Sequence, residues 1–271
     1  MIPATKIPSL KAPRESHFGR ISKNLRTSFF WAWLDTICRY RRSRIGPLWE
    51  TINVFVMVVG VTLVSSSIMG GRDILSSMPY VGLGIICWSA ISSIINSAST
   101  TFIRHAGQIR CSSMSIDLYV GRVVFGSLIT FCHHCLLYII GLLLLPIHLD
   151  WYTPLALVGI FLVYLNAFWV TSLLGFLCAR FRDLEQIVQN SVQLAFFVTP
   201  VFWHHDALSG NRRFIVDYNP LFYLLRIMRE PLLGQLPPLY VYLMVLGITV
   251  IGYGLLFITY RKMRAHLAFY V

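Results

Sequence analysis

Long apolar runs separated by short polar intervals make up most of the chain between residues 48 and 260. Each run is about 17 to 28 residues long, and about 20 helical residues cross the hydrocarbon core of a bilayer. The pattern therefore predicts an all-α integral membrane protein with six membrane-spanning helices. We expect these spans at about residues 48–69, 78–102, 118–145, 153–179, 187–203 and 239–260.

The segment before the first span has two parts. Residues 1–25 are polar and basic, contain prolines and show no apolar period, so we expect a cytoplasmic tail. Residues 26–42 place Phe30, Trp33 and Ile37 on one helical face, with basic residues opposite. Such an amphipathic helix lies in the plane of the membrane interface. A helix packed on a soluble partner fits the same pattern.

Charged turns alternate with short apolar units between Cys178 and Gly234. The unit Leu221–Leu233 is too short to cross a bilayer and is interrupted by Arg229 and Pro231. Ionisable residues this close to spans usually mark a path or a gate, so we expect short re-entrant or outer gate helices at the membrane edge. The alternative is an interfacial helix whose arginines extend to water.

Composition supports the membrane assignment. The chain is 56% hydrophobic, 13% charged and has a mean hydropathy of +0.66, whereas a soluble domain carries about 25% charged residues. The six cysteines show no paired spacing of a secreted scaffold, so we expect free thiols. No cleavable signal peptide is visible, and we expect the first span to act as its own signal.

The basic residues indicate the orientation of the chain. With both termini inside, 18 of the 23 lysines and arginines lie on the inner side, which the positive-inside rule favours. The net charge of +12 is therefore mostly a topological signal. We do not expect nucleic-acid binding, because nearly all the positive charge flanks spans on one side.

Three blocks, in order along the chain, carry a family resemblance. They are ARFRD at Ala179–Asp183, TPVFW at Thr199–Trp203 and the stretch from Asn219 to Gly234, which contains NPLFYLL. Together they resemble the membrane subunits of ABC-2 type transporters that export bacterial surface polysaccharides. The run from Leu118 to Tyr138 resembles the O-antigen branch of these exporters, and residues 44–49 resemble the start of their first span.

The resemblance implies a fold and partners. It implies a type V exporter-like six-helix transmembrane domain over 43–261, followed by a cytoplasmic C-terminus at 262–271. It also implies a homodimer in the bacterial inner membrane with two copies of a separate ABC ATPase, which would hold ATP and magnesium. The cargo would be a polysaccharide linked to undecaprenyl diphosphate, with membrane lipids as surroundings.

Candidate site residues follow from charge, from position and from the resemblance. The basic residues at the inner end of the first span would attract the diphosphate of the cargo. The resemblance implies an ATPase-coupling loop at 103–117 and an outer gate at 206–234. The lipid-headgroup cluster is Arg39, Arg41, Arg42 and Arg44; the coupling residues are Arg104, His105, Gln108, Arg110 and Asp117; the gate residues are Pro200, Asn219, Pro220, Tyr223, Arg226, Arg229 and Glu230.

Aromatic side chains are candidates for a polysaccharide channel, because their faces suit the C–H edges of sugar rings. Interfacial belts and ordinary packing explain the same residues equally well. The candidates are Trp88, Tyr138, Tyr164, Phe168, Trp169, Phe196, Phe197 and Trp203.

The run Cys132 to Cys135 brackets two histidines, which suggests a metal site at first sight. On a helix, His133 and His134 point about 100° and 200° away from the cysteine face, so the four side chains cannot close on one ion. We expect no metal here. Instead, one histidine should hydrogen-bond to a neighbouring helix.

The sequence also limits the function classes. No G-x-x-x-x-G-K-[ST] occurs, so the chain cannot hold a nucleotide in a P-loop, and no convergent acid/base set indicates an enzyme. We therefore expect a transport subunit rather than a catalyst. The alternatives are a capsular polysaccharide or teichoic acid exporter, an ABC-2 exporter of small molecules, and a membrane acyl- or glycosyltransferase. An ion channel fits least, since no filter sequence appears.

Overall fold

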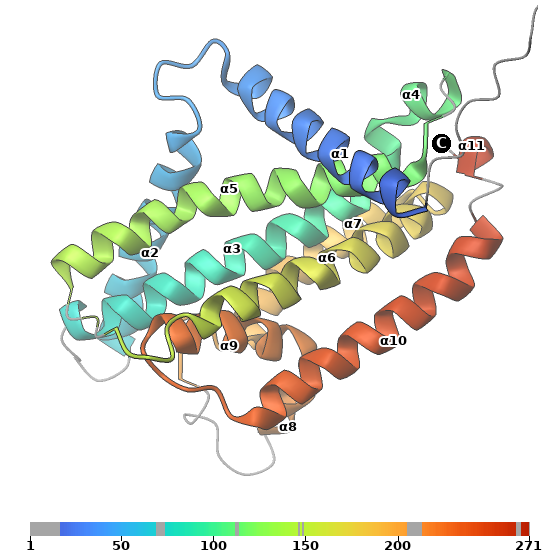
Figure 1. Cartoon of the computed structure of the whole chain (residues 1–271). Helices are drawn as coiled ribbons and strands as arrows, with labels where there is room; N and C mark the ends of the chain where they lie inside the picture. The colour runs from blue at the N-terminus through green and yellow to red at the C-terminus, as the bar shows by residue number, and fades with distance from the viewer. Residues whose placement is uncertain are drawn as a thin grey trace, which may run out of the picture.

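The computed structural model describes residues 17–68, 74–111, 114–145, 147, 149–204, 213–263 and 267–270. Every regular element among these residues is a helix, in agreement with the predicted class (Figure 1). The helices are α1 (His17–Tyr40), α2 (Leu48–Ile68), α3 (Ile74–Arg104), α4 (Ala106–Cys111), α5 (Ile116–Leu144), α6 (Leu155–Arg180), α7 (Asp183–Val198), α8 (Phe214–Asp217), α9 (Pro220–Leu232), α10 (Leu239–Met263) and α11 (Leu267–Tyr270).

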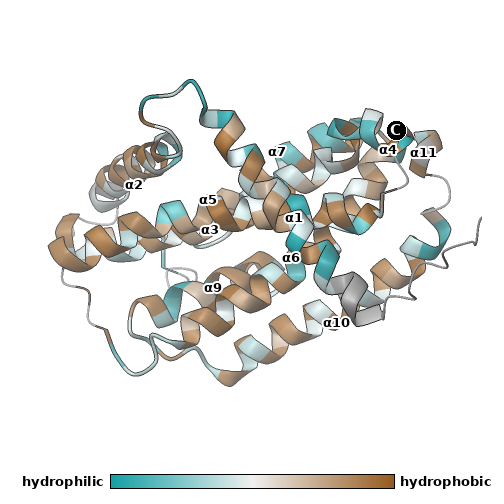
Figure 2. Cartoon of the chain, turned by 45° about the horizontal axis from the view of Figure 1, so that its top comes forward, coloured by the Kyte–Doolittle hydropathy of each residue, from teal (hydrophilic) through white to brown (hydrophobic). Residues whose placement is uncertain are grey.

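Five helices are long and apolar enough to cross a membrane. They are α2, α3, α5, α6 and α10, and their bounds differ from five of the predicted spans by no more than about four residues. Figure 2 shows these helices largely in the colours of hydrophobic residues, whereas α4 and the start of α7 carry hydrophilic colours. The multi-pass membrane character of the chain is therefore confirmed.

The helix α3 forms the centre of the bundle. It contacts α2, α5, α6, α7 and α9, and its middle turns are almost entirely buried (Figure 1). The outer helices α2 and α10 instead leave large apolar side chains exposed, including Val56 and Val250. An apolar surface of this kind suits lipid rather than water.

The predicted span 187–203 differs from the structure. Its helix, α7, begins earlier at Asp183 and ends at Val198, which leaves 16 residues, and it is not among the five candidate spans. Thr199 has an extended backbone, with φ −82° and ψ 135°. A residue that precedes proline disfavours the helical region, so Pro200 accounts for the early end.

Two predicted segments have other bounds in the structure. The helix α1 begins at His17, nine residues before the predicted start at residue 26, so part of the predicted tail is helical. The predicted coupling loop contains the short helix α4. Residues 1–16 of the tail, 112–113 of the coupling loop, 206–212 of the gate segment, and 264–266 and 271 of the C-terminus lie outside the described residues.

Most of the segments predicted to lie inside gather at one end of the bundle, called the inner end after that prediction, but the basic turn between α1 and α2 lies away from it (Figure 1). The α4 helix, the short C-terminal helix α11 and the connection between α6 and α7 meet at the inner end (Figure 1). Arg180 of that connection lies 5.8 Å from the ring centre of Tyr270 in α11. The opposite end of α3 meets α9 and the chain that follows α7.

Candidate functional site

At the inner end, α1 packs closely against α5. The Ser28 hydroxyl donates to the carbonyl of Leu118 at 3.2 Å, and a Cβ at Gly121 would lie only 2.6 Å from the Ser28 oxygen. Phe29 meets the edge of Phe125, with ring centres 5.7 Å apart. These contacts fix α1 as part of the bundle, while Trp33 on its other face stays about half exposed.

Arg122 joins three elements at this end. From α5 two nitrogens of its guanidinium group donate to the two carboxylate oxygens of Asp35 in α1, and the third lies 3.5 Å from the Gln108 side-chain oxygen in α4. The guanidinium carbon also lies 5.5 Å from the ring centre of Trp31. One side chain of α5 therefore contacts both α1 and α4. Sequence reasoning missed the pair, because Asp35 and Arg122 are 87 positions apart.

The predicted coupling residues surround this junction. His105 lies between α3 and α4, and its Nδ1 is 2.7 Å from the Thr101 carbonyl. Burial lowers the pKa of His105 against the opposing effect of that hydrogen bond, and the nearby Arg122 lowers it further. Asp117 accepts from the hydroxyl of Tyr260 at 3.3 Å. Of the remaining coupling residues, Arg104, Gln108 and Arg110 are exposed.

The basic cluster lies where α1 ends and α2 begins. Arg39 occupies the last turn of α1, and Arg41, Arg42 and Arg44 follow in the turn, all of them exposed. Gly46 has a φ of +65°, which only glycine adopts without strain, and it lets the chain reverse into α2. The Tyr40 hydroxyl donates to Glu50 at 2.9 Å and closes the turn.

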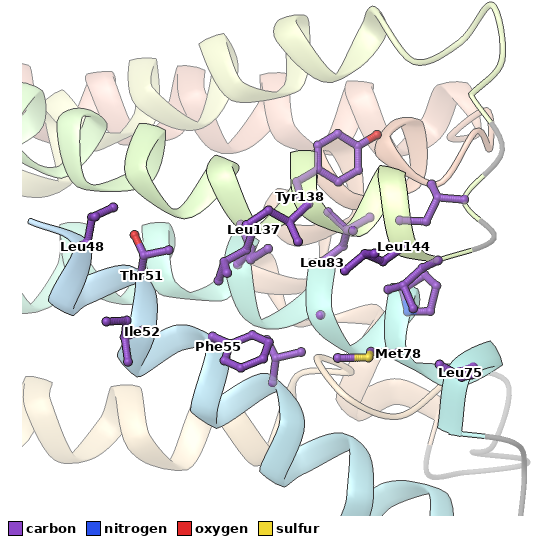
Figure 3. Close-up of a pocket in the computed structure, with 18 of the residues that line it drawn as sticks. Leu48, Thr51, Ile52, Phe55, Leu75, Met78, Leu83, Leu137, Tyr138 and Leu144 are labelled. Atoms are coloured by element: carbon purple, nitrogen blue, oxygen red, sulfur yellow. The ribbon is translucent and has the colours of Figure 1, made fainter.

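An apolar groove begins directly after this turn. It has a volume of about 660 Å³ and runs between α2, α3 and α5 from Ile45 toward Ile147. Figure 3 shows Phe55 and Met78 facing it from α2 and α3, with Leu137 and Tyr138 from α5. The walls suit hydrocarbon rather than sugar.

At the other end of the bundle, α9 is held by its first residues. The Asn219 side chain accepts from the backbone N–H of Leu221 at 3.0 Å and donates to the Thr199 hydroxyl at 2.8 Å. Pro220 occupies the first helical position, where its missing N–H costs nothing. The Tyr223 hydroxyl donates to the carbonyl of Asp217 at 2.7 Å. These bonds join α9 to the end of α7 and to α8.

The charged residues of α9 point into the protein. Arg226 pairs with Glu230 one turn later and donates to the Tyr240 hydroxyl at 2.6 Å. The side chains of the pair are only 11% and 10% exposed. The segment packs against α6 so closely that a Cβ at Gly159 would collide with the carbonyl of Ile227.

Arg229 is the most deeply buried of these charges, with 2% of its surface exposed. It donates to the Pro200 carbonyl at 2.7 Å, and its guanidinium carbon lies 4.0 Å from the ring centre of Tyr80 in α3. The alternative of an interfacial helix with arginines reaching water is therefore wrong. The carbonyls beyond α7 attract the guanidinium group, because they are left without helical partners there.

The predicted site residues do not form one group. All the predicted gate residues lie around α9 and the end of α7, whereas the coupling residues lie at the inner end. These two sets meet α3 near Tyr80 and near Arg104, positions that a helix separates by about 36 Å. The basic turn lies apart from both, because α2 begins beside the middle of α5, where the Thr51 hydroxyl donates to the carbonyl of His133 at 3.2 Å (Figure 1).

The aromatic candidates separate as well. Trp88 and Phe196 pack together between α3 and α7 at 5.9 Å, and Phe197 and Trp203 lie beside them. Tyr164 and Phe168 pack against α5, whereas Trp169 fills the space over Gly252 in α10. The Tyr138 hydroxyl donates to the carbonyl of Leu232 at 2.9 Å. The structure therefore does not bring all eight rings to one surface, and a channel role stays a prediction.

The two histidines of α5 turn to different partners. His134 Nδ1 lies 2.8 Å from the Ser89 hydroxyl in α3, which confirms the expected bond to a neighbouring helix. His133 Nδ1 contacts the carbonyl of Ile129 in its own helix at 2.7 Å. Cys132 and Cys135 are free thiols, as are the other four cysteines.

Comparison with known proteins assigns the family. Two O-antigen export system permease proteins, both called RfbA and both from Klebsiella pneumoniae, are similar to this chain at 24% identity. One similarity extends over 192 residues and covers 69% of this chain and 72% of the relative; the other extends over 201 residues and covers 72% and 76%. Residues 27–233, which run from within α1 to the end of α9, match the family described as ABC-2 type transporter. The chain therefore belongs to the ABC-2 type transporter family.

Proposed function

We propose that this chain is the membrane permease subunit of an ATP-driven exporter, which moves a lipid-linked polysaccharide of O-antigen type across the bacterial inner membrane. The similarity to two O-antigen export permeases over about 70% of the chain carries the proposal. The chain performs no catalysis in this proposal. Its sequence contains no P-loop, so two copies of a separate ABC ATPase would bind ATP and magnesium.

The working unit would be a homodimer with both termini in the cytoplasm and six membrane crossings in each copy. The sixth crossing would be made by α7 together with the chain up to Trp203. The Trp203 carbonyl accepts from the Tyr80 hydroxyl at 3.2 Å, so this passage reaches the end of α3 remote from Arg104. The 16 residues of α7 rise about 24 Å, and the turns at 199–203 continue the passage.

The inner side would receive the cargo and the force. Arg39, Arg41, Arg42 and Arg44 would attract the diphosphate, since local positive charge concentrates anions. The ATPase would press on α4, and Arg122 would pass its movement to α1 through Asp35. Helix α9 would close the outer end of the route until the subunits move, and exposed rings such as Phe197 would contact the polymer.

The first test is depletion of the protein. The polysaccharide retained inside the cell would be isolated, and its lipid would be released by mild acid and identified by mass spectrometry. We expect polymer on a polyprenyl diphosphate. Polymer on another glycolipid would favour the capsular or teichoic acid alternative, whereas no retained polymer would overturn the proposal and favour small-molecule export.

A second test concerns the basic cluster. Charge reversal by Arg41→Glu with Arg42→Glu should stop export at a normal protein level, because the diphosphate would then be repelled. Reversal of Arg261 and Lys262, which lie at the end of α10, is the matched control. Undisturbed export by the Arg41 and Arg42 variant would disprove this role for the cluster. Turnover of a glycosyl or acyl donor by the purified chain alone would instead indicate a membrane transferase.

A further inference from the structure

A polar pocket lies beneath α1, separate from the exposed basic turn. It has a volume of about 130 Å³, far above the roughly 10–15 Å³ that one water needs. Each of α1, α3 and α5 contributes one helical face to its wall, at spacings of three, four or seven residues. The ionisable lining residues are Asp35, Arg39, Arg104, Arg122 and His105, and the hydroxyl-bearing ones are Thr36, Ser93, Ser97, Thr100, Thr101, Ser127 and Thr130.

The charge of the lining is positive. Three guanidinium groups stand against one carboxylate among the lining residues, and that carboxylate, Asp35, is already paired with Arg122. The pKa of His105 is lowered, so its imidazole is neutral at pH 7 and adds no charge. Arg39 and Arg104 therefore provide about two positive charges at the mouth, where both are exposed.

The wall also presents accessible hydroxyl groups. Ser93 and Ser97 of α3 line the pocket and are partly exposed, whereas the Oγ of Ser127 is buried away from the cavity. A hydroxyl can donate to an anion, and the arginines carry the charge that a phosphate requires.

We propose that this pocket binds a phosphate group, with Arg104 and Arg39 at its mouth and Ser93 and Ser97 in its wall. The inference rests on the proposed export function for its purpose but adds a site to it, because, of the basic cluster, only Arg39 lines the pocket. The bound anion would lie against Arg122, which contacts α4. Occupancy of the pocket would therefore be sensed at the surface that faces the ATPase.

The surroundings favour the headgroup of a lipid as the source of the phosphate. The polar pocket and the apolar groove follow the same faces of α3 and α5: positions 93, 97, 101 and 104 continue the stripe of 79, 82 and 86. The hydrogen bond between Ser89 and His134 marks the boundary between them. Soluble phosphate presents the same chemistry to the arginines, so the experiment distinguishes the two sources.

The test measures binding to the purified full chain in phosphatidylcholine nanodiscs. The soluble probe is radiolabelled inorganic pyrophosphate in equilibrium dialysis, and the lipid probe is dioleoyl phosphatidic acid counted by native mass spectrometry. We expect Arg104→Gln to weaken binding about tenfold or more and Ser97→Ala to weaken it severalfold. Arg261→Gln removes an exposed arginine outside the pocket and should change binding less than twofold.

A variant that should strengthen binding distinguishes a specific effect from a loss of folding, which could only weaken it. Asp35→Asn removes the carboxylate from the wall and frees Arg122, so it should tighten binding of either probe. Equal weakening by Arg104→Gln and Arg261→Gln would mean diffuse surface charge, and would overturn the proposal. So would a wild-type chain that retains neither probe above the Arg104→Gln level.

The two probes separate the sources, and the assay separates this site from the export function. Retention of phosphatidic acid without pyrophosphate would assign a lipid headgroup, and the reverse would assign soluble phosphate. The measurement needs neither the ATPase nor a polymer, so absence of retained polysaccharide in depleted cells would leave it intact. Conversely, variants that lose probe binding but export polysaccharide normally would show that the site exists and that export does not need it.

Discussion

The two ends of the bundle use the same kind of ion pair in different surroundings. At the inner end, Arg122 and Asp35 are 17% and 41% exposed, and they border pockets open to solvent. At the other end, Arg226 and Glu230 are 11% and 10% exposed, and the neighbouring Arg229 is 2% exposed. Solvated charges can exchange partners cheaply, whereas buried ones cannot. The inner pair is suited to movement and the α9 pair to a fixed geometry.

The largest effect should come from breaking the α9 pair. Glu230→Ala leaves Arg226 buried without its carboxylate, and loss of one partner of such a pair costs about 3–5 kcal/mol. Thermal unfolding in detergent should show a fall of many degrees. The matched control is Asp217→Ala, which removes the exposed partner of Arg213 and should shift the midpoint by less than about 2 °C.

The close approach of α9 to α6 gives the next effect. Gly159→Ala places a methyl group against the carbonyl of Ile227 and should destabilise the fold by about 1–3 kcal/mol. Gly247→Ala in α10, where nothing lies within 4 Å of the added carbon, should be neutral or slightly stabilising. Equal unfolding midpoints for the two variants would show that α9 can shift away, against the fixed geometry inferred above.

The inner pair should matter more for transport than for stability. Arg122→Gln should cost no more than about 1 kcal/mol, because the pair is partly solvated. Polymer export should nevertheless fall severalfold at equal protein level, since α4 loses its link to α1. The swapped pair, Asp35→Arg with Arg122→Asp, should recover part of the export. If the single variant exported normally, the link would not transmit movement.

The smallest effect should be the pH response of His105. Its pKa in the folded chain lies below the usual value of 6.5, so both folded and unfolded forms are neutral at pH 8. As the pH falls below about 6.5, the unfolded chain takes up the proton first and stability declines. The unfolding midpoint should therefore drop more between pH 7.5 and 5.5 for the wild type than for His105→Gln. An equal drop would assign the response to other groups.

The apolar pattern predicted the five candidate spanning helices well, because a segment that crosses the bilayer core must be apolar and must form its backbone hydrogen bonds within itself. It predicted α1 from its aromatic face but placed its start too late, since contacts with α5, such as Asn24 with Ser115 at 3.1 Å, extend it. The pair Thr199–Pro200 signals the end of α7, but the apolar run continues past it and led to a predicted span that ends at residue 203. The restriction that proline places on the preceding residue outweighs hydrophobicity here.

The candidate site was less predictable. The sequence placed Arg229 and Glu230 near a gate, yet their burial depends on carbonyls about 28 positions earlier and on Tyr80 in another helix. The junction of Asp35, Gln108 and Arg122 is equally non-local. Charge and periodicity say which residues are unusual, whereas the choice of partner depends on which helix faces meet. The polar pocket follows from three such faces at once.

The surroundings of Arg229 have a consequence for biogenesis. The ring of Tyr80 and the carbonyls of Pro200 and Val201 all precede Arg229 in the chain, so the ribosome delivers them to the membrane first. A guanidinium group that enters hydrocarbon alone costs several kcal/mol. Helix α9 can therefore bury Arg229 only after α3 and α7 are inserted. The order of synthesis provides the partners of Arg229 before Arg229 itself.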